Sequence, residues 1–126
     1  LLGELYSTAH PAEPHGHVEA QTHQNPVDAT PASIAAGAAL YARQCAACHG
    51  PTGRGDGRLA AATAAYGRRP PNLTDAVWQH GGSDGEIFTA IRDGFTSGQE
   101  AVMVAFGDRF ADDDMWSIVN YLKQLR

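Results

Sequence analysis

Hydrophobic side chains recur at helical spacing in three stretches of the chain that follow residue 30. The first stretch begins at Thr30, a good helix-capping residue, and Pro31, which suits a first helical turn. Apolar positions then repeat every three or four residues as far as Ala46. This pattern predicts a helix over residues 31–46.

Two further helices are predicted in the second half of the chain. Ser83-x-x-Glu86 is a capping box, and the apolar face that follows it stops at Gly94, so a helix is expected over residues 83–93. The last helix covers about residues 112–125, where three aspartates favour the positive N-terminal end. Its apolar face consists of Met115, Ile118, Val119 and Leu122.

The segments between these helices are rich in glycine and proline. An alanine-rich stretch over residues 59–66 predicts a short helix, whereas residues 50–57, 67–73 and 94–107 are expected to be loop or irregular. No stretch shows the alternation of a strand. The sequence therefore predicts an all-α fold, and such long loops are acceptable in a small domain if they wrap something large and apolar.

The first 30 residues show neither a helical nor a strand period. They contain several prolines and histidines and few apolar residues after Tyr6, so they cannot bury enough surface to offset the entropy of ordering. We therefore predict a flexible arm or linker over residues 1–30 and one domain over residues 31–126. His15 and His17 could bind copper or zinc, although a polar linker composition explains them equally well.

Composition and charge narrow the function classes. The chain has 126 residues, of which 43% are hydrophobic, and it contains no run of about 18 apolar residues that would cross a bilayer. The net charge of −5 argues against a nucleic-acid binder. The charge is uneven, because residues 34–69 carry five arginines against the single acid Asp56. This basic segment predicts a positive rim that attracts an acidic redox partner.

The motif Cys45-Ala46-Ala47-Cys48-His49 carries the candidate chemistry. C-x-x-C-H is the attachment signature of haem c. Two cysteines three residues apart can reach the two vinyl groups at one edge of the porphyrin as thioethers, and His49 is then held where it can ligate the iron. These are the only two cysteines in the chain, so no thiol is left over.

Three alternative interpretations of the motif compete with haem attachment. A thioredoxin-type redox pair requires a βαβ context, for which there is no strand pattern. A zinc site requires a second Cys/His pair at suitable spacing, whereas His80 stands alone. A five-residue motif can also arise by chance.

Around this motif the chain resembles a class I c-type cytochrome of the short bacterial type. The resemblance covers about residues 31–126 and leaves residues 1–30 outside. The matching segments are Gly37-Ala-Ala-Leu-Tyr41, CAACHG at 45–50, PPNL at 70–73, GGSDGEIF at 81–88, MVAF at 103–106 and WSIVNYL at 116–122.

The resemblance implies a cytochrome c fold of three to five helices around one covalently bound haem c. It implies that Gly37 allows the first and last helices to cross closely, with Tyr41 packed near Ile118 and Tyr121. It also implies that the Pro71 carbonyl accepts a hydrogen bond from His49, which would fix the tautomer of the iron ligand. The haem pocket residues on this basis are Pro71, Leu73 and Phe106.

The sixth ligand of the iron has three candidates. Met103 lies in the stretch predicted to be irregular and is the preferred candidate, although the family usually has Met-Pro-x-Phe where this chain has Met103-Val104-Ala105-Phe106. Met115 shares the apolar face of the last helix, so we expect it to pack in the core. His80 stands beside two glycines and is expected to be an exposed loop residue.

His/Met ligation is typical of electron transfer, because it leaves no open position for a substrate. We therefore predict a one-electron carrier that is not itself an enzyme and that works with redox partner proteins. The resemblance implies a periplasmic or other extracytoplasmic location, because it implies haem attachment after export. The alternative is a cytochrome c domain of a larger membrane-anchored or copper-handling oxidoreductase, which passes electrons to its catalytic module. A third class, haem-based sensing or peroxidase activity, requires an open axial site.

Overall fold

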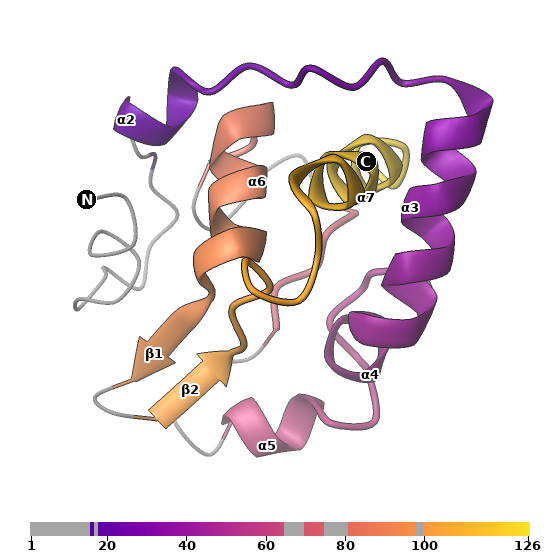
Figure 1. The fold of residues 1–126 in the computed structure, drawn as a ribbon. Coiled ribbons are helices and arrows are strands. Elements are labelled where there is room, and N and C mark those ends of the chain that lie inside the picture. The colour runs from indigo at the N-terminus through magenta and orange to yellow at the C-terminus, as the bar shows by residue number, and fades with distance from the viewer. Residues whose placement is uncertain (1–15, 17, 65–69, 75–80, 98–99) are drawn as a thin grey trace.

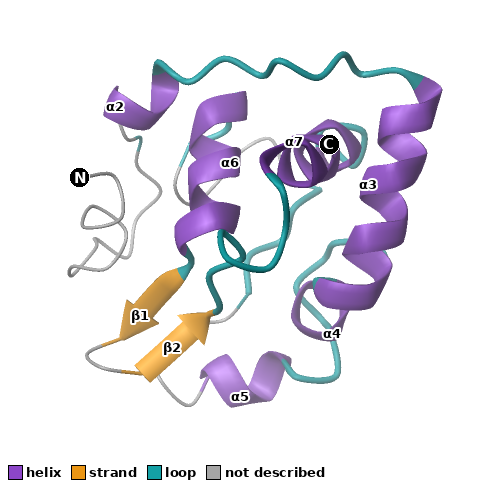
Figure 2. Cartoon of the chain, in the orientation of Figure 1, coloured by secondary structure: helices purple, strands orange, loops and turns teal. Residues whose placement is uncertain are grey.

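The computed structural model describes residues 16, 18–64, 70–74, 81–97 and 100–126 (Figure 1). The described helices are α2 (Val18–Gln21), α3 (Pro31–Gln44), α4 (Ala46–His49), α5 (Ala60–Ala64), α6 (Asp84–Asp93) and α7 (Asp112–Leu122). The described strands are β1 (Phe95–Ser97) and β2 (Glu100–Met103). Figure 2 shows that helices dominate and that the strands form one small hairpin. No helix among the described residues is long and apolar enough to cross a membrane.

The crossing of α3 and α7 forms the centre of the domain. The Thr30 side chain accepts a hydrogen bond from the backbone N–H of Ser33 at 3.1 Å, so α3 begins at the predicted residue. At Gly37 an added Cβ would overlap the backbone carbonyl of Ser117 on α7. A glycine is therefore required where the two helices touch, as the resemblance implied.

The other long helix, α6, packs on the opposite side of α7 from α3 (Figure 1). Its N-terminus has the predicted capping box, in which Ser83 Oγ accepts from the Glu86 N–H and the Glu86 carboxylate accepts from the Ser83 N–H. The rings of Phe88 and Trp116 stack with their centroids 4.0 Å apart and join α6 to α7. Gly94 ends the helix with a positive φ of 63°.

The core contains most of the apolar positions that the helical pattern selected. The completely or almost completely buried side chains include Tyr41, Met115, Ile118 and Val119. The rings of Tyr41 and Tyr121 lie 5.3 Å apart, so the predicted neighbours meet at the α3–α7 crossing. The prediction that Met115 packs in the core is consistent with its exposure of 0%.

Two elements differ from the sequence-based expectation. Residues 94–107 were expected to be irregular, but β1 and β2 pair as an antiparallel hairpin with Phe95 opposite Met103. Strands of three and four residues are too short to show an alternating pattern, which is why the sequence did not predict them. The fold class remains all-α.

The second difference concerns the expected flexible arm over residues 1–30. Residues 1–15 and 17 lie outside the described residues, but residues 18–30 run along α6 and α7 and join α3 (Figure 1). Ala20 is completely buried, and Asn25 Nδ2 donates to Asn120 Oδ1 at 2.7 Å. We call residues 18–30 the N-terminal strap. The expectation of a flexible arm is wrong for this strap, because polar and backbone contacts hold it without any apolar period.

Candidate haem site

The Cys-x-x-Cys-His motif lies on a single helical turn at the end of α3. The helix α3 ends at Gln44, and Cys45 links it to α4, which comprises Ala46–His49. The Cys45 N–H donates to the Tyr41 carbonyl at 2.8 Å, so the motif continues the path of a helix that is fixed in the core. Cys45, Cys48 and His49 are all half-buried.

The glycine-rich loop after the motif folds back onto it. The N–H groups of Gly55, Gly57 and Leu59 donate to the carbonyls of His49 at 2.7 Å, Cys48 at 3.0 Å and Ala47 at 2.8 Å, respectively. These bonds satisfy carbonyls that a four-residue helix leaves without partners. The loop therefore fixes the motif from the side opposite α3.

Tyr41 adds a contact that the sequence analysis did not foresee. Its hydroxyl donates to the Gly50 carbonyl at 2.6 Å, directly after the motif. Burial raises the pKa of Tyr41 well above its ordinary value, so the hydroxyl stays protonated and remains a donor. The sequence predicted Tyr41 only as a packing residue, and no local pattern signals a side-chain contact to a backbone group nine residues away.

The two thiols are available for covalent attachment. Cys45 and Cys48 are both free, so the motif is not a disulfide in this structure. Burial, with a smaller effect from Cys48, raises the pKa of Cys45 to about 12. The thiol is therefore neutral at ordinary pH, which is a poor state for metal binding as a thiolate. No group of three or more metal-binding side chains occurs within the described ranges.

His49 is held as a neutral imidazole. Burial lowers its pKa, and the nearby Pro71 carbonyl opposes this effect in part. Its Nδ1 atom is buried, yet it completes no hydrogen bond within the described part of the chain. A buried polar atom without a partner is costly, and a neutral imidazole is the form that ligates a metal.

The segment Pro70–Leu73 lies against the glycine-rich loop. An added Cβ at Gly55, whose φ is 80°, would overlap the Pro70 carbonyl, so the loop needs glycine there. The Leu73 N–H donates to the Gly53 carbonyl at 2.6 Å, and the Leu73 side chain is buried in the core cluster. The structure thus brings the Pro71 carbonyl near the motif, and Leu73 beside the loop that covers it.

Met103 lies at the end of β2, and the chain after it is tied to α6. The Phe106 N–H donates to the Ile91 carbonyl at 3.0 Å, and the Phe106 side chain is buried. Met103 itself is half-buried and packs against the core cluster, whereas Val104 is 41% exposed. The hairpin and α4 lie on different sides of the region above α5 (Figure 1). Met103 and His49 are thus carried by separate elements on different sides of that region.

The other two candidates for the sixth ligand are Met115 and His80. Met115 lies on α7 with no exposed surface, which places it inside the helical core rather than on a loop. His80 lies outside the described residues.

The residues present fit a covalently bound haem. Two free thiols and a neutral histidine lie within one helical turn. A methionine is available on a different element.

Comparison with known sequences decides how the motif is to be interpreted. The family described as "Cytochrome C oxidase, cbb3-type, subunit III" matches residues 32–122. The chain belongs to this family. It is a c-type cytochrome domain, and haem c is the cofactor that membership implies.

Curated relatives match more than two thirds of the chain. The cbb3-type cytochrome c oxidase subunit FixP of Azorhizobium caulinodans is 33% identical over 89 residues, which are 71% of this chain and 26% of the relative. The subunit CcoP of Cereibacter sphaeroides is 33% identical over 91 residues, which are 72% of this chain and 27% of the relative. The chain therefore spans about a quarter of the length of these relatives.

A solved structure supports the fold. A chain of the Kuenenia stuttgartiensis reducing HAO-like protein complex Kustc0457/Kustc0458 superposes with a TM-score of 0.68 and 27% identity. The match covers 79% of this chain and 46% of that one. The predicted all-α cytochrome c fold and the resemblance to c-type cytochromes are therefore confirmed.

Proposed function

We propose that this chain is a haem c domain of a larger oxidoreductase and passes electrons, one at a time, towards the catalytic module of that enzyme. The cbb3-type family match and the length of the relatives favour this function over that of a free-standing carrier. In this proposal the domain transfers electrons and is not itself the catalyst. Its partners are the other parts of the oxidase assembly.

The observation that carries the proposal is the geometry around His49. A neutral imidazole, with the Pro71 carbonyl nearby, stands directly after two free thiols on one helical turn. We assign Cys45 and Cys48 to the two thioether bonds, and His49 would ligate the iron. The chain contains two cysteines, both in this motif, so we propose one haem.

The residues around the motif have distinct positioning roles in this proposal. The Pro71 carbonyl orients the His49 ring through Nδ1, which leaves the other nitrogen for the metal. Leu73 and Phe106 supply apolar walls that keep water away from the ring. Met103 would supply the second protein ligand of the iron, and the hydrogen bond between Phe106 and Ile91 would limit the movement of its loop.

Haem c supplies reversible one-electron exchange between ferric and ferrous iron. The chain's part is to keep both axial positions occupied, so that no substrate binds and the coordination changes little between oxidation states. A thioether ligand favours the ferrous state and so raises the reduction potential. We place the domain on the extracytoplasmic side of the membrane, because haem c is attached after export. In this proposal the parent protein anchors the domain to that membrane.

Two measurements on the expressed chain test this function. Mass spectrometry under denaturing conditions should show one haem retained covalently, and the reduced visible spectrum should be that of low-spin haem c. Carbon monoxide should leave the spectrum of the reduced protein unchanged. Binding of carbon monoxide by the native protein would instead favour sensing or peroxidase activity, and a mass without haem would contradict the proposal.

A further inference from the structure

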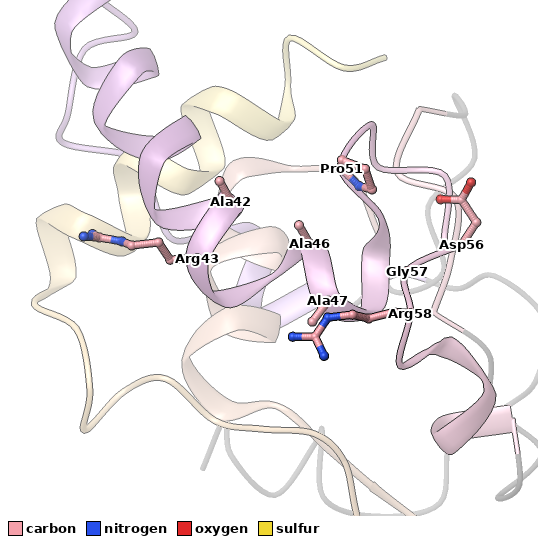
Figure 3. A pocket seen from close by; sticks show the side chains of 8 residues that line it. All are labelled: Ala42, Arg43, Ala46, Ala47, Pro51, Asp56, Gly57 and Arg58. Atoms are coloured by element: carbon pink, nitrogen blue, oxygen red, sulfur yellow. The ribbon is translucent and has the colours of Figure 1, made fainter.

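A shallow groove of about 310 Å³ lies on the outer face of the site, where α3, α4 and the glycine-rich loop meet (Figure 3). Its lining includes Ala42 and Arg43 from α3, Ala46 and Ala47 from α4, and Gly57 and Arg58 from the loop. Neither the family match nor the proposed ligand set assigns a role to this groove.

The floor of the groove is open because its residues are small. Ala42, Ala46 and Ala47 present only methyl groups, and an added Cβ at Gly57 would overlap the Ala47 carbonyl. The floor carbonyls of Ala46 and Ala47 already accept hydrogen bonds at 2.8 Å from Gly50 and Leu59, respectively. The floor therefore offers apolar contact, while its backbone acceptors are already engaged.

The basic side chains of the groove are Arg43 and Arg58, which lie on either side of the alanines, and the Arg43 side chain extends away from them (Figure 3). Arg43 and Arg58 are exposed and make no ion pair with another described residue. The one acid in the lining, Asp56, has its carboxylate beside Gly50 and turned away from the alanines (Figure 3). The groove is thus locally positive in a chain whose net charge is −5.

We propose that this groove is the docking site for a carboxylate-bearing peptide segment of the redox partner. Two guanidinium groups on either side of a narrow apolar floor fit a chain segment with two acidic side chains, because guanidinium and carboxylate pair with matching geometry. The occupant would contact Ala46 and Ala47, the two residues between the cysteines. A docked partner would therefore be held next to the haem attachment. The identity of the occupant as a redox partner rests on the proposed function.

The test measures binding of a hexaglutamate peptide to the haem-loaded protein by calorimetry at low salt. We expect Arg43→Gln and Arg58→Gln together to weaken binding about fivefold, the effect of two exposed ion pairs. Ala42→Phe fills the groove without changing the charge, and it should weaken binding as well. Each single variant, Arg43→Gln or Arg58→Gln, should weaken binding less than the pair. The matched control for the single variants is Arg109→Gln, which also removes one positive charge, beside Phe106, and it should bind the peptide like the unaltered protein.

Three outcomes would overturn the proposal. Equal weakening by Arg109→Gln and by either single groove variant would show that only net charge matters. Unchanged binding by Ala42→Phe would place the peptide outside the groove. Tighter binding of anionic phospholipid vesicles than of the peptide, lost in the same arginine variants, would make the groove a lipid contact. The haem spectrum, recorded for every variant, tests the proposed function separately, because none of these residues is an assigned ligand.

Discussion

The two sides of the α3–α7 pair are stabilised in different ways. On the α6 side, stacked rings, a complete capping box and the N-terminal strap provide partners from within the chain. On the α4 side, backbone hydrogen bonds join the glycine-rich loop to the motif, but two free thiols and a neutral imidazole remain. The first side is complete as a protein structure, whereas the second is built for a group that the chain does not itself supply.

The largest expected effect comes from removing the haem attachment. Cys45→Ala with Cys48→Ala should abolish covalent haem and destabilise the loops over 50–59 and 70–74, because haem supplies much of the apolar surface of so small a domain. Amide hydrogen exchange should show protection lost first in these loops and retained longest in α6 and α7. Denaturing mass spectrometry checks the loss of haem.

Equal loss of amide-exchange protection on the α6 side and the α4 side would contradict the proposed difference between them. In that case the α6 side would depend on the haem as much as the α4 side. Native far-UV circular dichroism together with native exchange in the loops would show that neither side needs it.

Variants of the two methionines distinguish ligation of the iron from packing in the core. Met115→Ala should lower the free energy of unfolding by about 2–5 kcal/mol, because a completely buried side chain is truncated in the α7 core. It should leave the near-infrared band of iron–thioether bonding in place. Chemical denaturation and the near-infrared spectrum of the ferric protein measure the two effects.

Met103→Ala should give the opposite result. We expect the thioether band to vanish, the reduction potential to fall and carbon monoxide to bind the reduced protein, with a smaller loss of stability because Met103 is only half-buried. If the band survived in this variant and vanished in Met115→Ala, the ligand would be Met115.

The sequence predicted the long helices of the domain better than it predicted the N-terminal strap and the β1–β2 hairpin. The starts of α3 and α6 follow from side-chain caps, and α7 follows from apolar spacing, which are local properties of the sequence. The helices α3 and α7 end at Gln44 and Leu122, earlier than the predicted residues 46 and 125. The strap was missed because its attachment depends on Asn25 and Asn120, which are 95 residues apart and belong to no motif. The β1–β2 hairpin was missed because its strands are too short to show a period.

At the candidate site the sequence predicted the Cys-x-x-Cys-His motif, but it did not predict the hydrogen bonds that hold the motif in place. The spacing of Cys45, Cys48 and His49 follows from covalent chemistry at one porphyrin edge. The bonds from Gly55 and Gly57 to the motif depend on how a loop folds back, which the glycine pattern only permits. The assignments of Met103, Pro71, Leu73 and Phe106 stay predictions, and the Met103→Ala variant tests the first of them.

A moderate effect is expected where the strap is attached to α7. Asn120 is 3% exposed, and its Nδ2 donates to the Val27 carbonyl at 3.0 Å and to Ser33 Oγ at 3.2 Å. Asn120→Ala removes the bonds to the Val27 carbonyl, to Ser33 Oγ and from Asn25 Nδ2, so we expect a loss of about 1–3 kcal/mol in the free energy of unfolding. The exposed neighbour Gln124→Ala is the matched control and should cost little.

Deletion of residues 1–29 also tests how much the N-terminal strap contributes to stability. The deletion removes the buried Ala20 and the Asn25 contact, so the melting temperature should fall while the haem spectrum is retained. An unchanged melting temperature would show that the strap adds no stability and that the domain is complete from residue 30.

The smallest expected effect is electrostatic and concerns the α4 side alone. A chain of net charge −5 would repel an anionic reagent such as hexacyanoferrate, so its electron-exchange rate would rise as salt screens the repulsion. If electrons pass through the α4 side, the exchange rate should instead fall as salt is added, because the reagent would be attracted by Arg43, Arg54 and Arg58, which are exposed. Stopped-flow measurements should therefore show a rate that falls with salt, and Arg58→Gln should reduce the slope. Lys123→Gln should leave the slope unchanged, because Lys123 lies just after α7 and pairs with Asp84 at 2.7 Å. A rate that rises with salt in the unaltered protein would mean that electrons do not pass through the basic side.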